Sequence, residues 1–150
     1  MLTDVTAFAP ATVANVGIGF DILGHTVEAV GDKVRLRRID EPVVRIRSIS
    51  GIAGDLPVEP ANNTAGRAVQ AMHAALQLDF GFEMDIEKGI PLGSGLGGSA
   101  ASAVAAVVAA NALLRTPVPR LQLLKFAMLS ICAEPLATRS EEHTSELQSQ

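Results

Sequence analysis

Residues 89–99 read GIPLGSGLGGS and lead directly into an alanine-rich run at residues 100–114. Glycine adopts positive φ without strain, so this segment can turn sharply and bring its backbone close to a ligand. Successive N–H groups in such turns form a concave nest for anions, and a following helix adds about half a positive charge at its first turn. We expect Ser99 to be the N-cap of that helix. The stretch therefore predicts a phosphate-binding loop.

The same stretch has three alternative interpretations, namely a P-loop, a dinucleotide-binding fingerprint and a plain buried helix. A P-loop ends in Gly-Lys-Ser/Thr, whereas this loop ends in Gly-Gly-Ser and contains no lysine. Gly93, Gly95 and Gly98 match the G-x-G-x-x-G of dinucleotide-binding folds. That fingerprint also needs an acidic residue at a strand end about 20 residues on, and here the position falls in the next helical region. A buried alanine-rich helix after a flexible loop stays open as the simplest alternative.

A membrane span is a further alternative, because no charged residue interrupts residues 89–114. Glycine and alanine are only marginally apolar, and Pro91 together with the glycines breaks the first half of the run. No aromatic residues flank it in the way that interfacial belts do. We therefore favour the anion-binding loop over a span.

The bulk composition narrows the class of protein. The chain has 150 residues, 48% of them hydrophobic, which is enough for one modest core. Its net charge of −4 and its lack of Trp and Tyr argue against a nucleic-acid surface. A single cysteine excludes an internal disulfide and fits a reducing cytoplasm. The N-terminus lacks a basic segment followed by an apolar run, so we expect no signal peptide.

Strands are predicted where apolar and polar residues alternate. We expect a strand at residues 5–8, a strand-and-turn unit at 9–21, a pair of strands at 33–39 and 43–49 joined by a turn at 40–42, and a strand at 82–88. In one strand of the pair, Val44 and Ile46 alternate with Arg45 and Arg47, as in a half-exposed antiparallel sheet. We expect these arginines to form a solvated face.

Three helices are predicted from apolar residues at helical spacing and from capping signals. The first is capped by the segment Asn62-Asn63-Thr64 and runs to about Leu78, the second covers residues 100–114 after the glycine loop, and the third covers residues 120–133. Together with the strands they predict a mixed fold with one core in residues 1–138.

Residues 139–150 read RSEEHTSELQSQ and break abruptly with the apolar helix before them. The string looks like the translation of a sequencing-library adapter, and a genuine disordered polar tail is the alternative. On the first interpretation, residues 1–138 are the N-terminal part of a longer protein and 139–150 are non-native.

Two motifs together carry a family resemblance. Residues 10–24 read PATVANVGIGFDILG, and residues 91–101 read PLGSGLGGSAA. The pair resembles the GHMP small-molecule kinases over about residues 5–138, and the first motif is similar to the homoserine-phosphorylating branch. The resemblance implies an α+β fold of the ribosomal-S5-domain-2-like type.

The resemblance also implies the site residues. ATP would be held by Asn63, near the adenine, and by the loop residues Pro91, Leu92, Gly93, Ser94, Gly95, Leu96, Gly97, Gly98, Ser99 and Ala100. Mg²⁺ would be held by Ser99 and Glu134, and L-homoserine by Asn15 and Asp21. The alternatives are purely structural roles, as an ordinary N-cap for Asn63 and as a turn carboxylate for Asp21. Many relatives carry serine where this chain has Gly98, so the nest loses one hydroxyl.

The function implied by the resemblance is transfer of the γ-phosphoryl group of ATP to the hydroxyl of L-homoserine, a step of threonine synthesis. We assign no general base, and His143 does not replace the family's His-x-Asp-Asn segment. Alternatives are a GHMP kinase for another alcohol, such as mevalonate or a sugar, and an inert fragment that at most binds nucleotide weakly. We expect a cytoplasmic protein without nucleic-acid or membrane partners, and the resemblance leaves a homodimer of the longer protein open.

Overall fold

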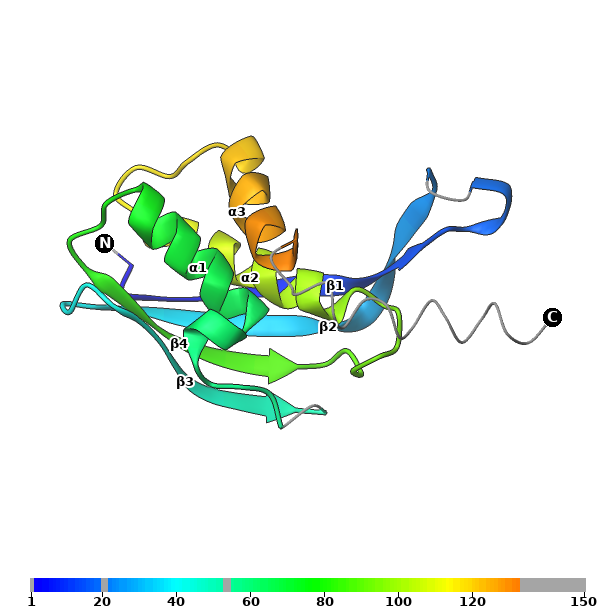
Figure 1. Ribbon diagram of the computed structural model, residues 1–150, viewed down its shortest axis with the longest axis horizontal. Helices are drawn as coiled ribbons and strands as arrows, with labels where there is room; N and C mark the ends of the chain where they lie inside the picture. Colours follow the sequence, from blue (N-terminus) through cyan, green and yellow to red (C-terminus); the bar gives the residue numbers. More distant parts are fainter. Residues whose placement is uncertain (1, 20–21, 53–54, 133–150) are drawn as a thin grey trace.

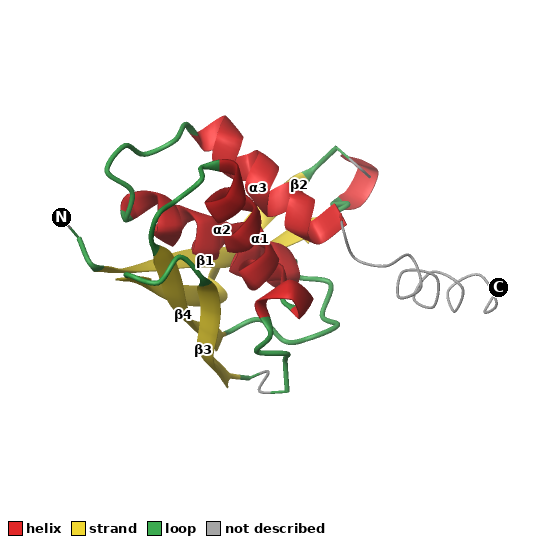
Figure 2. Cartoon of the chain, turned by 60° about the vertical axis from the view of Figure 1, so that its left-hand side comes forward, coloured by secondary structure: helices red, strands yellow, loops and turns green. Residues whose placement is uncertain are grey.

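The computed structural model describes residues 2–19, 22–52 and 55–132. A four-stranded sheet, in the order β1-β2-β4-β3, forms one layer, and helices α1, α2 and α3 cover one of its faces (Figures 1 and 2). The expected α+β fold is confirmed. The core lies between the two layers and is built from the inward side chains of alternate strand positions, such as Val34, Leu36, Met84 and Ile86.

The first two strands form a long antiparallel hairpin. β1 (Asp4–Ala14) runs without a break where two separate units at residues 5–8 and 9–21 were expected, so that boundary was wrong. Its pairing with β2 (Gly24–Ile39) shifts register between Pro10 and Ala11. Proline has no N–H for the ladder and is accommodated at such an irregularity, so the strand continues through it. The tip of the hairpin projects beyond the helices (Figure 1).

The pairing expected between residues 33–39 and 43–49 was also wrong. β4 (Gly81–Lys88) lies between β2 and β3 (Val44–Gly51), antiparallel to the first and parallel to the second. A parallel pair needs a crossover connection, which α1 (Thr64–Ala75) supplies between β3 and β4. The period of two shows which side chains face the core, but it does not identify the neighbouring strand.

The helices lie close to where they were expected. α2 (Gly98–Ala112) packs against β1, β2, α1 and α3 (Arg120–Cys132), and small buried residues such as Ala103, Ala106 and Ala110 permit this close approach. The described residues also form two 3₁₀ turns, η1 (Gly17–Gly19) and η2 (Pro60–Asn62). Among the described residues no helix is both long and apolar enough to cross a bilayer.

Candidate functional site

The loop between β4 and α2 has an alternating backbone conformation. Gly93, Gly95 and Gly97 have φ values of 67°, 68° and 70°, and the residues between them do not. Alternation of left-handed and ordinary residues turns successive N–H groups toward one side of the chain, which is the geometry of an anion nest. The loop ends at the N-terminus of α2, where the helix dipole favours negative charge.

The glycines differ in what surrounds them. A Cβ at Gly93 or Gly95 would meet nothing within 4 Å, so these positions need glycine for its conformation and leave open space around the loop. A Cβ at Gly97 would lie 2.5 Å from Thr12 Oγ1. The Thr12 N–H also donates to the Leu96 carbonyl at 3.0 Å. This contact joins the first motif, on β1, to the glycine loop.

Ser94 and Ser99 serve the local backbone in different ways. The Ser94 hydroxyl donates to the Pro91 carbonyl at 2.7 Å and accepts the Leu96 N–H at 3.4 Å, so it holds the turn from within. Ser99 was expected to cap α2, but the N-cap is Gly97, whose carbonyl accepts the Ala101 N–H at 2.9 Å. The left-handed glycine ends the loop two residues earlier than the serine, which places Ser99, exposed, in the first helical turn.

Asn63 is the N-cap of α1 and is 7% exposed. Its Oδ1 accepts the N–H groups of Ala65 at 3.0 Å and Gly66 at 3.4 Å, while Nδ2 donates to the Pro57 carbonyl at 3.2 Å. Asn63 is therefore an ordinary N-cap of α1, as the alternative interpretation of this residue expects. These contacts do not exclude a further role of Asn63 in binding. Next to it, the Thr64 hydroxyl donates to the Ser99 carbonyl at 3.3 Å, so the N-termini of α1 and α2 meet beside the glycine loop.

The remaining expected site residues are only partly described. Asn15 follows β1 with a left-handed φ of 59°, in the exposed turn before η1. Asp21 and Glu134, expected to bind substrate and metal, lie outside the described residues, as does the 139–150 segment. Within the described ranges, no three His, Cys, Asp or Glu side chains gather as a metal site. The structure thus brings the two motifs together at Thr12 but leaves the substrate carboxylate and the metal carboxylate untested.

A buried polar cluster under the loop was not predicted from the sequence. It consists of Asp32 on β2, Lys88 at the end of β4 and Ser102 on α2, exposed by 0%, 3% and 3%. A signal was available: Asp32 and Lys88 occupy the core-facing positions of strands whose other core-facing residues are mainly apolar. A charged residue in that register either ends the buried face or has a buried partner.

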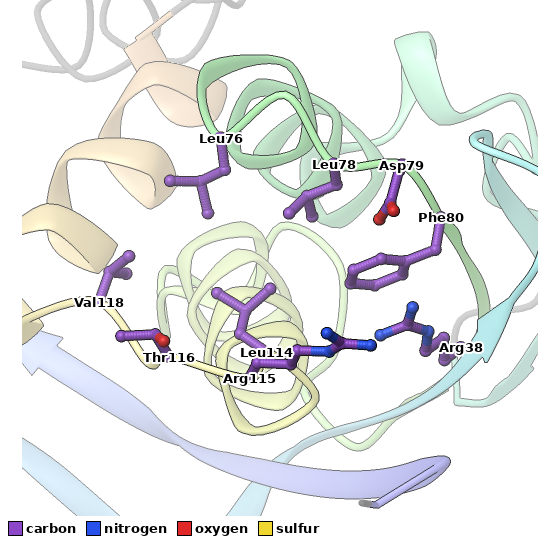
Figure 3. Close-up of a pocket in the computed structure, with 9 residues that line it drawn as sticks. All are labelled: Arg38, Leu76, Leu78, Asp79, Phe80, Leu114, Arg115, Thr116 and Val118. Atoms are coloured by element: carbon purple, nitrogen blue, oxygen red, sulfur yellow. The ribbon is translucent and has the colours of Figure 1, made fainter.

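A pocket lies near the opposite end of α2 (Figure 3). It has a volume of about 330 Å³ and is lined by Arg38, Leu76, Leu78, Asp79, Phe80, Leu114, Arg115, Thr116 and Val118. The Arg38 guanidinium stacks over the Phe80 ring, 3.5 Å from its centroid. A helix of this length spans about 22 Å, so the pocket is separate from the glycine loop.

Comparison with known proteins identifies relatives of the chain. Residues 63–134 match the family described as GHMP kinases N terminal domain. The chain is 59% identical over 127 residues to a homoserine kinase of Xanthomonas campestris pv. campestris (strain B100), covering 85% of this chain and 39% of that protein. A homoserine kinase of Xylella fastidiosa (strain 9a5c) is 59% identical over 122 residues, covering 81% and 38%. The chain therefore spans about two fifths of the length of these curated relatives.

Solved structures of homoserine kinase and mevalonate kinase also resemble this chain. The crystal structure of a homoserine kinase from Cytophaga hutchinsonii matches with a TM-score of 0.81 and 46% identity, covering 87% of this chain and 41% of that one. A mevalonate kinase structure matches with a TM-score of 0.65 at 14% identity, which shows a shared fold alone.

Proposed function

Because this chain belongs to the GHMP kinase family through its N-terminal domain, we propose that it is the N-terminal part of a homoserine kinase. The longer protein would transfer the γ-phosphoryl group of ATP to the hydroxyl of L-homoserine in the cytoplasm. One observation supports this most directly: Gly93, Gly95 and Gly97 adopt left-handed conformations in succession at the N-terminus of α2. Phosphoryl transfer needs mainly positioning and neutralisation of charge, which such a loop supplies.

The nucleotide would lie against the loop formed by residues 91–100, with its phosphates at the N–H groups of the glycines. Asn63 would border the adenine. Its two capping bonds occupy Oδ1, but an amide nitrogen has two hydrogens and only one is donated to Pro57. The other hydrogen can serve a ring nitrogen of the base without loss of the cap.

Mg²⁺ would be held by the Ser99 hydroxyl and the Glu134 carboxylate. Both are hard oxygen donors of the kind that this ion prefers, and Ser99 lies exposed in the first turn of α2. The ion would neutralise charge on the transferred phosphoryl group.

L-homoserine would bind at the first motif. The Thr12 N–H bond to Leu96 places this motif next to the loop, so a substrate held by Asn15 and Asp21 would lie near the nucleotide. A carboxylate such as that of Asp21 suits the α-amino group of an amino acid through a charge-assisted hydrogen bond. We assign no general base.

The proposal is tested on the full-length protein, obtained by reading the parent DNA through Thr138. We expect ADP release from ATP that depends on L-homoserine, with little release for mevalonate or galactose. Release with mevalonate or a sugar but not with homoserine would favour another GHMP kinase. We expect no homoserine-dependent release from the 150-residue chain alone, because it spans only about two fifths of the length of the homoserine kinases that it matches. If the parent DNA instead encodes RSEEHTSELQSQ within a longer reading frame, the adapter interpretation is wrong.

The loop assignment is tested by replacing Gly95 with valine in the full-length protein. Valine at a φ of 68° is strained, so the nest should distort and the KM for ATP should rise about 100-fold, with a smaller effect on the KM for homoserine. Lys33→Met is the control, because it changes an exposed side chain that pairs with Glu87 and is not among the loop residues. An unchanged KM for ATP in Gly95→Val would contradict the assignment.

The amino-acid specificity is tested by Asp21→Asn. We expect homoserine binding to weaken by about 1.5–3 kcal/mol, the strength of a hydrogen bond to a charged group, while ATP binding changes little. Equal losses for both ligands would place Asp21 outside the substrate pocket.

A further inference from the structure

The buried cluster of Asp32, Lys88 and Ser102 is not part of the proposed ATP, Mg²⁺ or homoserine site. The three side chains come from β2, β4 and α2, and each is at least nine-tenths buried. Lys88 is the last residue of β4 and directly precedes the glycine loop. The cluster therefore lies where the sheet, the loop and the helix meet.

Asp32 contacts the beginning of the loop. Its Oδ1 accepts the N–H groups of Gly89 at 3.0 Å and Ile90 at 3.2 Å. Its Oδ2 accepts the Ser102 hydroxyl at 2.6 Å and pairs with the Lys88 ammonium group. The carboxylate thus holds the two backbone N–H groups that open the loop.

Lys88 contacts the end of the loop. Its Nζ donates to the Gly98 carbonyl at 3.1 Å and to the Ser102 hydroxyl at 2.8 Å, in addition to the pair with Asp32. An ammonium group has three hydrogens, and these three partners use all of them. One ion pair consequently joins the residues that begin and end the loop.

This arrangement separates Lys88 from the lysine of a P-loop. A P-loop lysine reaches the phosphates of the nucleotide, whereas Lys88 is 3% exposed and its hydrogens are already donated within the protein. Its charge is balanced by Asp32 below the loop. Lys88 is therefore unsuited to be a phosphate ligand in this conformation.

A buried ion pair is also an inefficient way to stabilise a fold. Two charges lose their hydration, and apolar residues of similar volume often give equal or greater stability. The same two strands carry an exposed pair, Lys33 with Glu87 at 3.0 Å, at adjacent positions on the opposite face of the sheet. Linking β2 to β4 therefore does not require the buried pair.

We propose that Asp32, Lys88 and Ser102 are positioning residues, which hold the two ends of the glycine loop so that Gly93, Gly95 and Gly97 present their N–H groups to a nucleoside triphosphate. The proposal rests on the function proposed above. It assigns the cluster to nucleotide affinity and not to the binding of the acceptor alcohol.

The experiment compares the double variant Asp32→Leu/Lys88→Met, the single variant Ser102→Ala and the control Lys33→Met in the full-length protein. The double variant removes both charges together, so no buried charge is left unpaired. We measure thermal unfolding, hydrogen exchange of the loop amides, and KM for ATP and for L-homoserine. Lys33→Met removes a β2–β4 ion pair that lies on the other face.

We expect the double variant to stay folded, with faster loop exchange and a KM for ATP raised about tenfold, while the KM for homoserine stays within about twofold. Ser102→Ala should show the same pattern more weakly, and Lys33→Met should show none of it. A folded double variant with unchanged loop exchange and unchanged KM for ATP would overturn the proposal. If the double variant does not fold, Ser102→Ala decides by the same measurements.

The two proposals fail in distinguishable ways. Absence of homoserine-dependent turnover in the unmodified protein would contradict the proposed function, and hydrogen exchange would still show whether the cluster holds the loop. Normal turnover together with an unaffected loop in the variants would contradict the positioning role alone.

Discussion

Lys33, Arg35 and Arg37 of β2 lie on the open face of the sheet, where they pair with Glu87, Asp4 and Glu83. On the helix-covered face the same strand presents Asp32, Val34 and Leu36, all with 0% exposure. Exposed pairs are screened by water and contribute little, whereas a buried pair is costly unless each polar atom has a partner. The comparison shows that ion pairs between the same two strands differ with the face of the sheet. On the open face they are solvated, whereas on the helix-covered face the pair must satisfy every polar atom with a partner.

The largest expected effect comes from breaking the buried pair on one side. Lys88→Met leaves the Asp32 carboxylate buried without its cation, so the free energy of unfolding should fall by about 3–5 kcal/mol. The matched change Lys33→Met on the open face should cost less than about 1 kcal/mol. Denaturant unfolding of both variants of the full-length protein measures the difference. Similar losses would mean that burial does not distinguish the two faces.

Replacing Asn63, a buried but uncharged side chain, should have an intermediate effect on the free energy of unfolding. Asn63→Ala removes the acceptor of the Ala65 and Gly66 N–H groups at the start of α1, and loss of an N-cap costs about 1 kcal/mol. Asn63→Asp should keep part of this stability, because a carboxylate also caps a helix N-terminus but cannot donate to the Pro57 carbonyl. Equal losses in the two variants would argue against capping as the source of the stability. A KM for ATP that rises in Asn63→Asp alone would indicate an additional contact of the amide with the base.

The smallest expected effect concerns the pH dependence of the open face. The Arg47 guanidinium, which donates to Asp85 at 2.8 Å, holds the pKa of that carboxyl below its usual value, with a smaller contribution from the Ser48 hydroxyl. A carboxyl whose pKa is lowered by folding stabilises the folded state above its unfolded pKa. That contribution is lost as the pH falls through the folded value.

Asp85→Asn should therefore leave stability near neutral pH little changed, since the pair is exposed to solvent. As the pH falls below about 4 the wild-type contribution declines, so the difference between the two proteins should shrink and should vanish below the folded pKa of Asp85. Thermal unfolding between pH 2 and 7 follows this, and raised salt should reduce the difference at neutral pH. A stability difference between wild type and Asp85→Asn that grows as the pH falls would contradict a stabilising Arg47–Asp85 pair.

The local sequence allowed several parts of this fold and site to be predicted. Asn63 caps α1, and the glycines at 93, 95 and 97 do adopt the left-handed conformations that the loop requires. The alternating arginines of β3 lie on the open face, where Arg47 pairs with Asp85. Each of these features depends on preferences of a residue and its near neighbours along the chain.

Other features escaped prediction because they depend on contacts between distant segments. Residues 33–39 and 43–49 are close in sequence and look like a hairpin, yet β4 lies between them. The start of α2 depends on the geometry of the loop around Gly97, so the capping preference of Ser99 was misleading.

By itself, the sequence determined which segments become strands and helices, that a glycine loop precedes α2, and which family the chain belongs to. These follow from backbone preferences, the period of the apolar residues and two motifs. The tertiary structure alone decided that β4 is central, that Thr12 touches the loop, and that Asp32, Lys88 and Ser102 meet beneath it. The physical reason is that a local pattern specifies the face on which a side chain lies, whereas its partner is chosen by packing among segments far apart in the chain.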